Sequence, residues 1–123
     1  MKIRIKGNSI RLRLTKTEIA NFGEQGIIEE ETQFPGGSRL CYALISKEGI
    51  ENTSASFHDN RITVWVPEKI KQTWTSTDLV GFDEKILLEN GQLLLLLIEK
   101  DFVCLDNTLE DQSDNYPNPN AVC

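Results

Sequence analysis

The chain has 123 residues, a net charge of −6, 39% hydrophobic residues and 26% charged residues. These values are typical of one globular domain with a single core. The longest apolar run, residues 93–98, is far shorter than the roughly 20 residues of a membrane helix. Lys2 and Arg4 also interrupt the place where a secretory signal would stand. We therefore expect a cytoplasmic protein that makes no contact with a membrane.

The cysteines and the single histidine favour neither a disulfide framework nor a metal centre. Cys41, Cys104 and Cys123 form no Cys-x-x-Cys pair, and His58 is the only histidine. Structural zinc sites normally need such closely spaced ligands. We expect no metal and no cofactor.

The first half of the chain has the pattern of a hairpin, a helix and a second hairpin. Strands are expected over residues 2–6, 9–14, 27–34 and 39–46, with a Gly-Asn turn at residues 7–8. Thr15 and Glu18 have the spacing of a helix capping box. Ile19 and Phe22 then supply an apolar stripe, so a helix is expected directly after the first hairpin.

The second half shows the same order. Strands are expected over residues 54–57, 61–66, 79–88 and 93–100, with turn signals at residues 59–60 and 90–91. Pro67 stands where the first residue of a helix would be. Ile70 and Trp74 supply the apolar stripe of that helix.

The two halves align without a gap at an offset of 52 residues. The matched pairs include Ile5 with Phe57, Ile10 with Ile62, Phe22 with Trp74, and Phe34 with Ile86. A repeated order with matching apolar positions indicates an internal duplication. We expect an α+β fold with an antiparallel, barrel-like sheet of about eight strands and two helices. Residues 1–100 would form this single domain, with repeats at about 1–50 and 51–100, followed by an acidic C-terminal tail at 101–123.

Five basic residues share one face of the first hairpin: Lys2, Arg4, Lys6, Arg11 and Arg13. With the turn at residues 7–8, Arg4 faces Arg11 and Lys2 faces Arg13, and opposed like charges destabilise an antiparallel pair. The equivalent face of the second half has one basic residue, Arg61. The fold itself therefore does not require this charge.

Two interpretations of the basic face stay open. Glu29 and Glu31 share one face of a neighbouring strand and would neutralise it in a charge ladder. Alternatively, the five basic side chains bind an anion, because guanidinium groups form paired hydrogen bonds with phosphate. We predict a non-catalytic module that binds a phosphorylated small molecule through these five residues, with no catalytic residue and no metal ligand.

Within residues 9–100, a unit of one strand, a helix and three strands is repeated. This order is similar to that of the CYTH-like triphosphate tunnel proteins. That resemblance implies a barrel that binds and hydrolyses triphosphates with metal ions, so an enzyme here would be phosphohydrolase-like. The alternating glutamates of that family are replaced by Arg11 and Arg13, so no catalytic residue is carried over. Over its whole length, and most clearly in the ending FVCLDNTLEDQSDNYPNPN, the chain resembles a family of small uncharacterised bacterial proteins.

The alternative function is a structural or protein-interaction role, as a homodimer or in docking to a partner. Residues 93–98 are apolar on both faces of the last strand, which therefore needs cover on both sides. For an enzyme, one histidine leaves few choices for acid–base catalysis, although Glu29, Glu31 and Glu99 are available carboxylates. Nucleic acid is not expected as a partner, because an acidic chain repels the phosphate backbone.

The tail at residues 101–123 contains five acidic residues and no Lys or Arg. Its composition favours an extended, solvated segment. Two specific roles stay open. The tail would neutralise the basic hairpin, or Phe102, Val103, Leu105 and Tyr116 would anchor it over the last strand.

Overall fold

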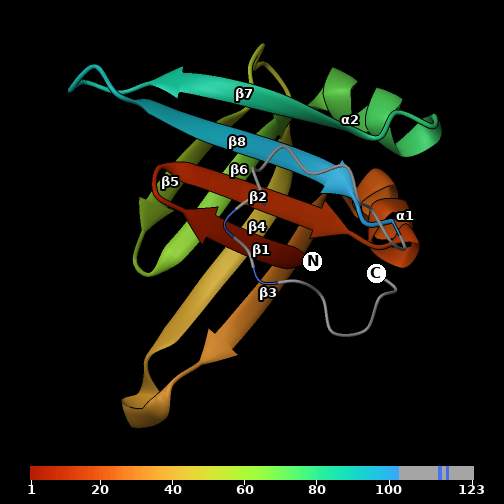
Figure 1. Cartoon of the computed structure of the whole chain (residues 1–123). Helices are drawn as coiled ribbons and strands as arrows, with labels where there is room; N and C mark the ends of the chain where they lie inside the picture. Colours follow the sequence, from red (N-terminus) through yellow and green to blue (C-terminus); the bar gives the residue numbers. More distant parts are fainter. Residues whose placement is uncertain (103–113, 115, 117–123) are drawn as a thin grey trace.

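A computed structural model describes residues 1–102, 114 and 116 of the chain (Figure 1). The strands are β1 (Lys2–Lys6), β2 (Ser9–Leu14), β3 (Ile27–Gln33), β4 (Arg39–Lys47), β5 (Ser54–His58), β6 (Arg61–Pro67), β7 (Gly81–Leu87) and β8 (Leu93–Lys100). The helices are α1 (Lys16–Gln25) and α2 (Glu68–Ser76), and a short 3-10 turn, η1, spans Pro35–Gly37. All predicted strands and both helices are confirmed. Most of the predicted tail, with Cys104 and Cys123, lies outside the described residues.

The strands form two separate four-stranded sheets that lie face to face (Figure 1). Sheet A has the order β1-β2-β8-β7, and sheet B has the order β3-β4-β6-β5. The α+β class is confirmed, but the predicted antiparallel barrel is wrong. The sheets do not close on each other, and each is mixed, because β2 pairs in parallel with β8 and β4 pairs in parallel with β6.

The barrel prediction fails because alternation shows which side chains face the core and not which strands become neighbours. Helix α1 leads from β2 in sheet A to β3 in sheet B, and α2 leads from β6 in sheet B to β7 in sheet A. Each sheet therefore combines the first hairpin of one half with the second hairpin of the other half.

The order of elements repeats as expected, but the repeat contains a shift. Ser9 lies opposite Leu95 in the β2–β8 pair, and Arg61 lies opposite Cys41 in the β6–β4 pair. The first hairpins thus correspond at an offset of 52 residues, whereas the second hairpins correspond at an offset of 54. The predicted match of residue 34 with residue 86 is therefore wrong, because the shift falls between each helix and the strand that follows it.

Both helices cover the same end of the two sheets and complete the core (Figure 1). Helix α1 begins with the predicted capping box, in which Thr15 N–H donates to the Glu18 carboxylate at 2.9 Å and Glu18 N–H donates to the Thr15 hydroxyl. Helix α2 begins one residue later than predicted, since Pro67 still belongs to β6. The rings of Phe22 and Trp74, both fully buried, meet edge to face with centroids 6.1 Å apart. No helix in the described residues is long and apolar enough to span a membrane.

Strand β8 is central in sheet A, between β2 and β7. On its inner face, Leu96 and Ile98 are buried in the core, with only 1% of each residue exposed. On its outer face, Leu93 and Leu95 are 44% and 41% exposed. The predicted cover is thus present on the inner face, while the outer face stays open around Leu93 and Leu95 in the part of the chain that the structure describes.

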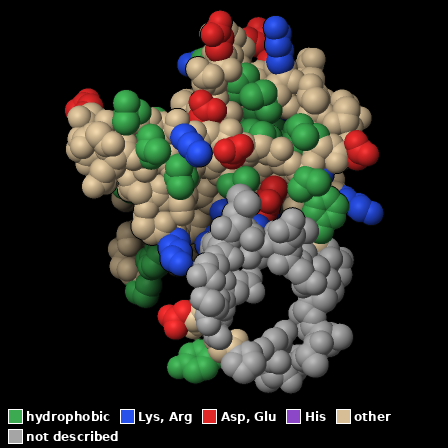
Figure 2. Space-filling model, turned by 45° about the horizontal axis from the view of Figure 1, so that its top comes forward, with side chains coloured by type: hydrophobic (Ala, Val, Ile, Leu, Met, Phe, Trp, Pro, Cys, Tyr) green, Lys and Arg blue, Asp and Glu red, His purple; other side chains and the backbone are tan. Residues whose placement is uncertain are grey.

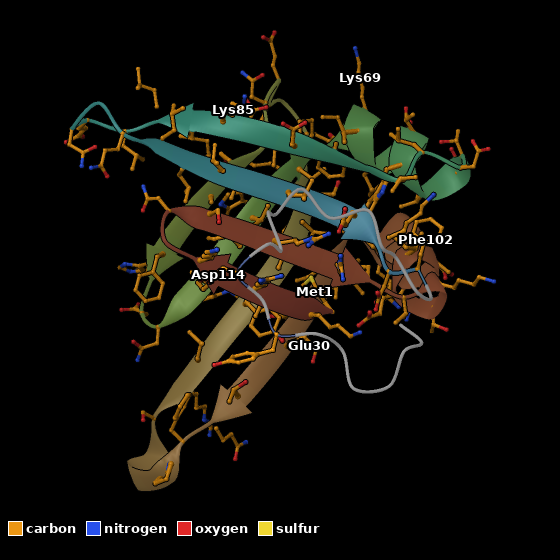
Figure 3. All side chains as sticks on the ribbon, viewed as in Figure 1. Met1, Glu30, Lys69, Lys85, Phe102 and Asp114 are labelled. Atoms are coloured by element: carbon orange, nitrogen blue, oxygen red, sulfur yellow. The ribbon has the colours of Figure 1, made fainter. Side chains whose placement is uncertain are left out.

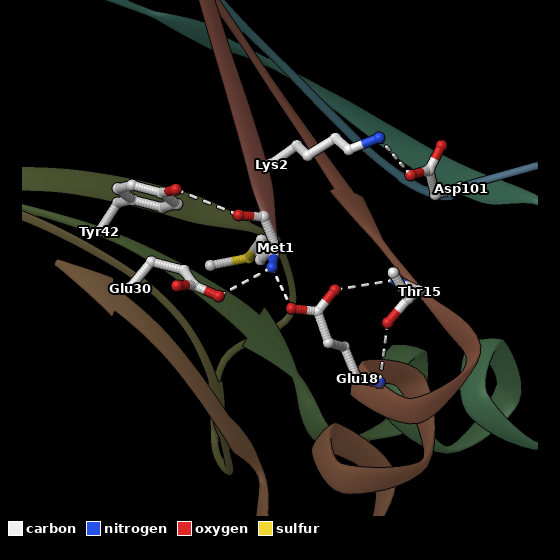
Figure 4. A network of polar contacts seen from close by, with 7 residues as sticks. All are labelled: Met1, Lys2, Thr15, Glu18, Glu30, Tyr42 and Asp101. Atoms are coloured by element: carbon white, nitrogen blue, oxygen red, sulfur yellow. Dashed lines mark hydrogen bonds and ion pairs between the residues drawn. The ribbon is translucent and has the colours of Figure 1, made fainter. Parts of the chain in front are cut away.

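The amino group of Met1 is held between two carboxylates at the junction of the sheets and α1 (Figures 3 and 4). It donates to Glu18 Oε2 and, at 2.9 Å, to Glu30 Oε1. The Tyr42 hydroxyl donates to the Met1 carbonyl oxygen at 3.1 Å. The first strand is therefore fixed to α1 and to sheet B through Met1, the residue that precedes it.

These contacts change two pKa values in opposite directions. Burial would lower the pKa of the Met1 amino group, but the hydrogen bonds and charges of Glu18 and Glu30 outweigh burial and raise it above 8.0. Burial would raise the pKa of the Glu18 carboxyl, but hydrogen bonds from the Met1 amine and Thr15 outweigh burial and lower it below 4.5.

We predict that the Met1–Glu18 contact makes the free energy of unfolding depend on pH at both ends of the range. The amine has a raised pKa, so its contribution is complete below pH 8.0 and is lost as pH rises through the folded value. The Glu18 carboxyl has a lowered pKa, so its contribution is complete above pH 4.5 and is lost as pH falls through the folded value. Glu18→Gln should lower the free energy of unfolding near pH 7 by about 1.5 kcal/mol.

Urea unfolding between about pH 3 and pH 10 measures this effect, since these limits lie about 1.5 and 2 units beyond the ordinary pKa values of 4.5 and 8.0. The profile of Glu18→Gln should be flatter than that of the wild type at both ends. Glu24→Gln, on the exposed side of the same helix, is the control and should leave the profile unchanged. Identical profiles for Glu18→Gln and the wild type would contradict the prediction.

Candidate functional site

Four of the five predicted basic residues border one cleft at the outer face of sheet A. The cleft has a volume of about 310 Å³ and is lined by Lys2, Ile3, Arg4, Arg11 and Arg13; we call it the basic cleft. The β1–β2 register is the predicted one, with Arg4 opposite Arg11 and Lys2 opposite Arg13. The fifth predicted residue, Lys6, does not line this cleft.

The two arginines of β2 converge on one buried carboxylate, Glu99 of β8. Glu99 Oε1 accepts hydrogen bonds from Arg11 Nε at 2.7 Å and from Arg13 Nε at 2.8 Å, and Arg11 Nη2 makes an ion pair with the same oxygen. The parallel β2–β8 register places Arg13 directly opposite Glu99. Because one carboxylate holds two guanidinium groups, this Arg–Glu–Arg cluster keeps one unit of positive charge.

Gly81 of β7 lies on the other side of Glu99 and permits the close approach of β7 to β8. The two residues are opposite each other in the β7–β8 register. A Cβ atom at Gly81 would come within 2.5 Å of the Ile98 carbonyl oxygen and within 2.7 Å of Glu99 Cβ. Any side chain at this position would therefore displace the backbone that carries Glu99.

The two remaining basic residues of the cleft, Lys2 and Arg4, also have interaction partners. Lys2 Nζ lies 2.8 Å from Asp101 Oδ2, directly after β8 ends. Arg4 takes part in an interaction as well. The acidic partners of the basic cleft that are described here, Glu99 and Asp101, come from β8 and from the residue that follows it.

The predicted neutralisation by Glu29 and Glu31 is wrong. Both residues lie in sheet B, where Glu29 Oε2 lies 2.7 Å from an Arg61 guanidinium nitrogen and Glu31 Oε1 lies 3.7 Å from one of Arg39. The prediction assumed that β3 lies beside the first hairpin. Helix α1 instead carries the chain to the opposite sheet before β3 begins.

The equivalent face of sheet B carries no such cluster. Thr63, Trp65 and Ile45 occupy the positions that correspond to the three residues of the Arg–Glu–Arg cluster. Lys47 Nζ lies 5.3 Å from the centroid of the Trp65 ring, so this tryptophan packs against its own sheet. The same backbone arrangement therefore forms with and without the charged cluster.

Other reactive residues stand apart from the basic cleft. His58 Nε2 lies 3.1 Å from Asp59 Oδ2 at the β5–β6 turn, where both side chains are more than four-fifths exposed, at 87% and 86%. Half-buried Cys41 lies near Glu31 in sheet B, with its Sγ atom 3.8 Å from Oε2. Among the described residues, no three His, Cys, Asp or Glu side chains gather into a group that fits a metal ion. The chemistry that the cleft offers is charge-assisted hydrogen bonding.

A comparison with known protein families matches residues 1–120 to DUF7009, a family of unknown function. No match was found among curated proteins or among solved structures. The resemblance to CYTH-like proteins therefore gains no support from a solved structure, and the two open sheets differ from the barrel that it implied. Since the family match covers nearly the whole chain, the protein belongs to DUF7009.

Proposed function

We propose that the protein binds a phosphate-bearing small molecule in the basic cleft and does not transform it. One observation carries this proposal: basic side chains from both strands of the first hairpin border a single cleft of about 310 Å³. A cleft of this size is within the lower range of small-molecule sites. Several cations spread over two strands suit a di- or triphosphate better than a single phosphate.

The Arg–Glu–Arg cluster supports the proposal, because Glu99 holds the guanidinium groups in place. Among the described residues, Arg13 uses only Nε toward Glu99, which leaves its Nη donors for a ligand. A guanidinium that is already ordered loses less side-chain entropy when it binds phosphate. The positive charge that remains on the cluster attracts a second anion.

The test is a thermal-shift titration at low salt with tripolyphosphate, nucleotides and sulfate, each with and without magnesium. A ligand at a hundred times its dissociation constant adds about 2.7 kcal/mol and raises the Tm of a domain of this size by several degrees. Arg11→Ala combined with Arg13→Ala should abolish a shift caused by polyphosphates. Arg4→Gln, which leaves Glu99 paired, should reduce the shift without the loss of a buried partner.

The matched control is Arg39→Ala combined with Arg61→Ala, which removes the same charge from sheet B. This variant should keep the full polyphosphate shift, because its arginines lie outside the basic cleft. No shift of the wild-type protein with any anion would contradict the proposal. If the control variant lost the shift to the same extent, the binding would be a general attraction between opposite charges and the proposal of a specific site would be wrong.

A second candidate function is self-association through the outer face of β7 and β8. Leu87, Leu93 and Leu95 are 72%, 44% and 41% exposed, and Leu87 lies opposite Leu93 in the sheet. Figure 2 shows exposed hydrophobic side chains gathered between charged ones. Exposed apolar side chains that lie next to one another are found at interaction sites.

Sedimentation equilibrium over a range of protein concentrations tests this second candidate. We expect a homodimer whose dissociation constant rises at least about tenfold when Leu93 and Leu95 are replaced by serine, since each loses buried apolar area. Phe34→Ser, at the exposed turn between β3 and β4, is the control. A monomeric wild-type protein at the highest concentration would exclude this candidate.

A further inference from the structure

A second groove lies on the outer face of sheet A, beside the basic cleft. Its volume is about 250 Å³, and its walls come from residues 9–11 of β2, 95–97 of β8 and 83–85 of β7. All of the described wall residues belong to sheet A, so the groove opens on the face that points away from sheet B. We call it the outer groove.

The strand register shows which side chains point into the outer groove. Ile10 and Leu96 belong to the core or pack against it, so alternation turns their neighbours on each strand outward. One outward row consists of Ser9, Leu95 and Lys85, and the next row consists of Arg11, Leu97 and Asp83. The outer groove thus has an apolar floor of two leucines between a basic wall on β2 and a charged wall of both signs on β7.

Arg11 connects the outer groove with the basic cleft, because it lines both. From this residue the basic cleft extends toward β1 and the outer groove extends toward β7. Neighbouring strands are about 4.8 Å apart, so β2 and β7 are separated by about 10 Å. A ligand with phosphates in the basic cleft can therefore place an uncharged ring system over the leucines of β8.

The wall on β7 offers one hydrogen-bond acceptor and one donor. Asp83 and Lys85 are exposed, and neither side chain has a partner among the described residues. Glu84 alternates with them and points to the inner side of the sheet. A carboxylate repels phosphate, so Asp83 suits a ligand whose far end donates hydrogen bonds. Guanine has this character, since its edge combines N–H donors with the O6 acceptor.

We infer that the ligand of the basic cleft is a nucleoside polyphosphate whose base lies in the outer groove. This inference rests on the proposed function, because the phosphates need the basic cleft. The base covers Leu95, which is 41% exposed, and half-buried Leu97, so apolar area leaves water on binding. Its N–H groups donate to the Asp83 carboxylate, and its carbonyl oxygen accepts from Lys85.

The test compares GTP with tripolyphosphate by isothermal titration calorimetry of the full chain at low salt. GTP should bind at least about tenfold more tightly, because the hydrogen bonds to charged side chains and the buried apolar area both add to its affinity. Asp83→Ala should lower the affinity for GTP about tenfold. The same variant should not lower the affinity for tripolyphosphate, because it removes a negative charge and no phosphate contact.

The matched control is Glu89→Ala, in the turn between β7 and β8, which removes the same charge outside the outer groove. This variant should not lower the affinity for GTP. Asp83 and Glu89 are both exposed, so both variants should fold. An equal loss of GTP affinity in the two variants would show that the base makes no contact with β7 and would overturn the inference.

The remaining outcomes separate this inference from the proposed function. If tripolyphosphate binds and GTP binds no more tightly, the inference is wrong and the proposed function stands. If neither binds, both are wrong. Leucine-methyl NMR reports other occupants of the groove. Shifts of Leu95 that follow protein concentration would assign it to a second copy of the chain. Contacts of Leu97 with residues 103–123 that persist at saturating GTP would assign it to the end of the chain, and either result would overturn the inference.

Discussion

The parallel pairing of β2 with β8 is the constraint on which the rest of the structure depends. It joins the first hairpin of the chain to its last strand, and its counterpart, β4 with β6, joins the other two hairpins. Neither half of the sequence therefore contains a complete sheet, and the core fills only when both halves are present. The same pairing brings Glu99 beside Arg11 and Arg13 and so builds the candidate site.

The proposed anion site would give the Arg–Glu–Arg cluster a role that a gain in stability does not. Removal of charges from water offsets most of the attraction within a buried ion pair, so such a cluster is weak evidence for stabilisation. Sheet B forms the same strand arrangement with Thr63, Trp65 and Ile45 at the equivalent positions. The basic cleft thus arises from a difference between the repeats.

Local elements were predictable from the sequence because their signals act within a few residues. The hairpin turns and the Thr15–Glu18 capping box are of this kind, and so is the clustering of basic residues within one hairpin. Sheet membership was not predictable from alternation, because it depends on where α1 and α2 carry the chain. Glu99 is 86 positions from Arg13, and only the parallel pairing brings them together. The apolar run at residues 93–98 did hold a signal, since near-continuous apolar strands are typical of central, parallel-paired positions.

The most direct test of this account is the free energy of unfolding of Glu99→Gln at low salt, measured with and without tripolyphosphate. Without an anion, the variant leaves Arg11 buried beside a neutral partner and should lose about 3 kcal/mol. If the basic cleft is an anion site, tripolyphosphate should restore more free energy to the variant than it adds to the wild type, because the ligand takes over the charge of Glu99. An equal or absent effect of tripolyphosphate on the two proteins would contradict the account.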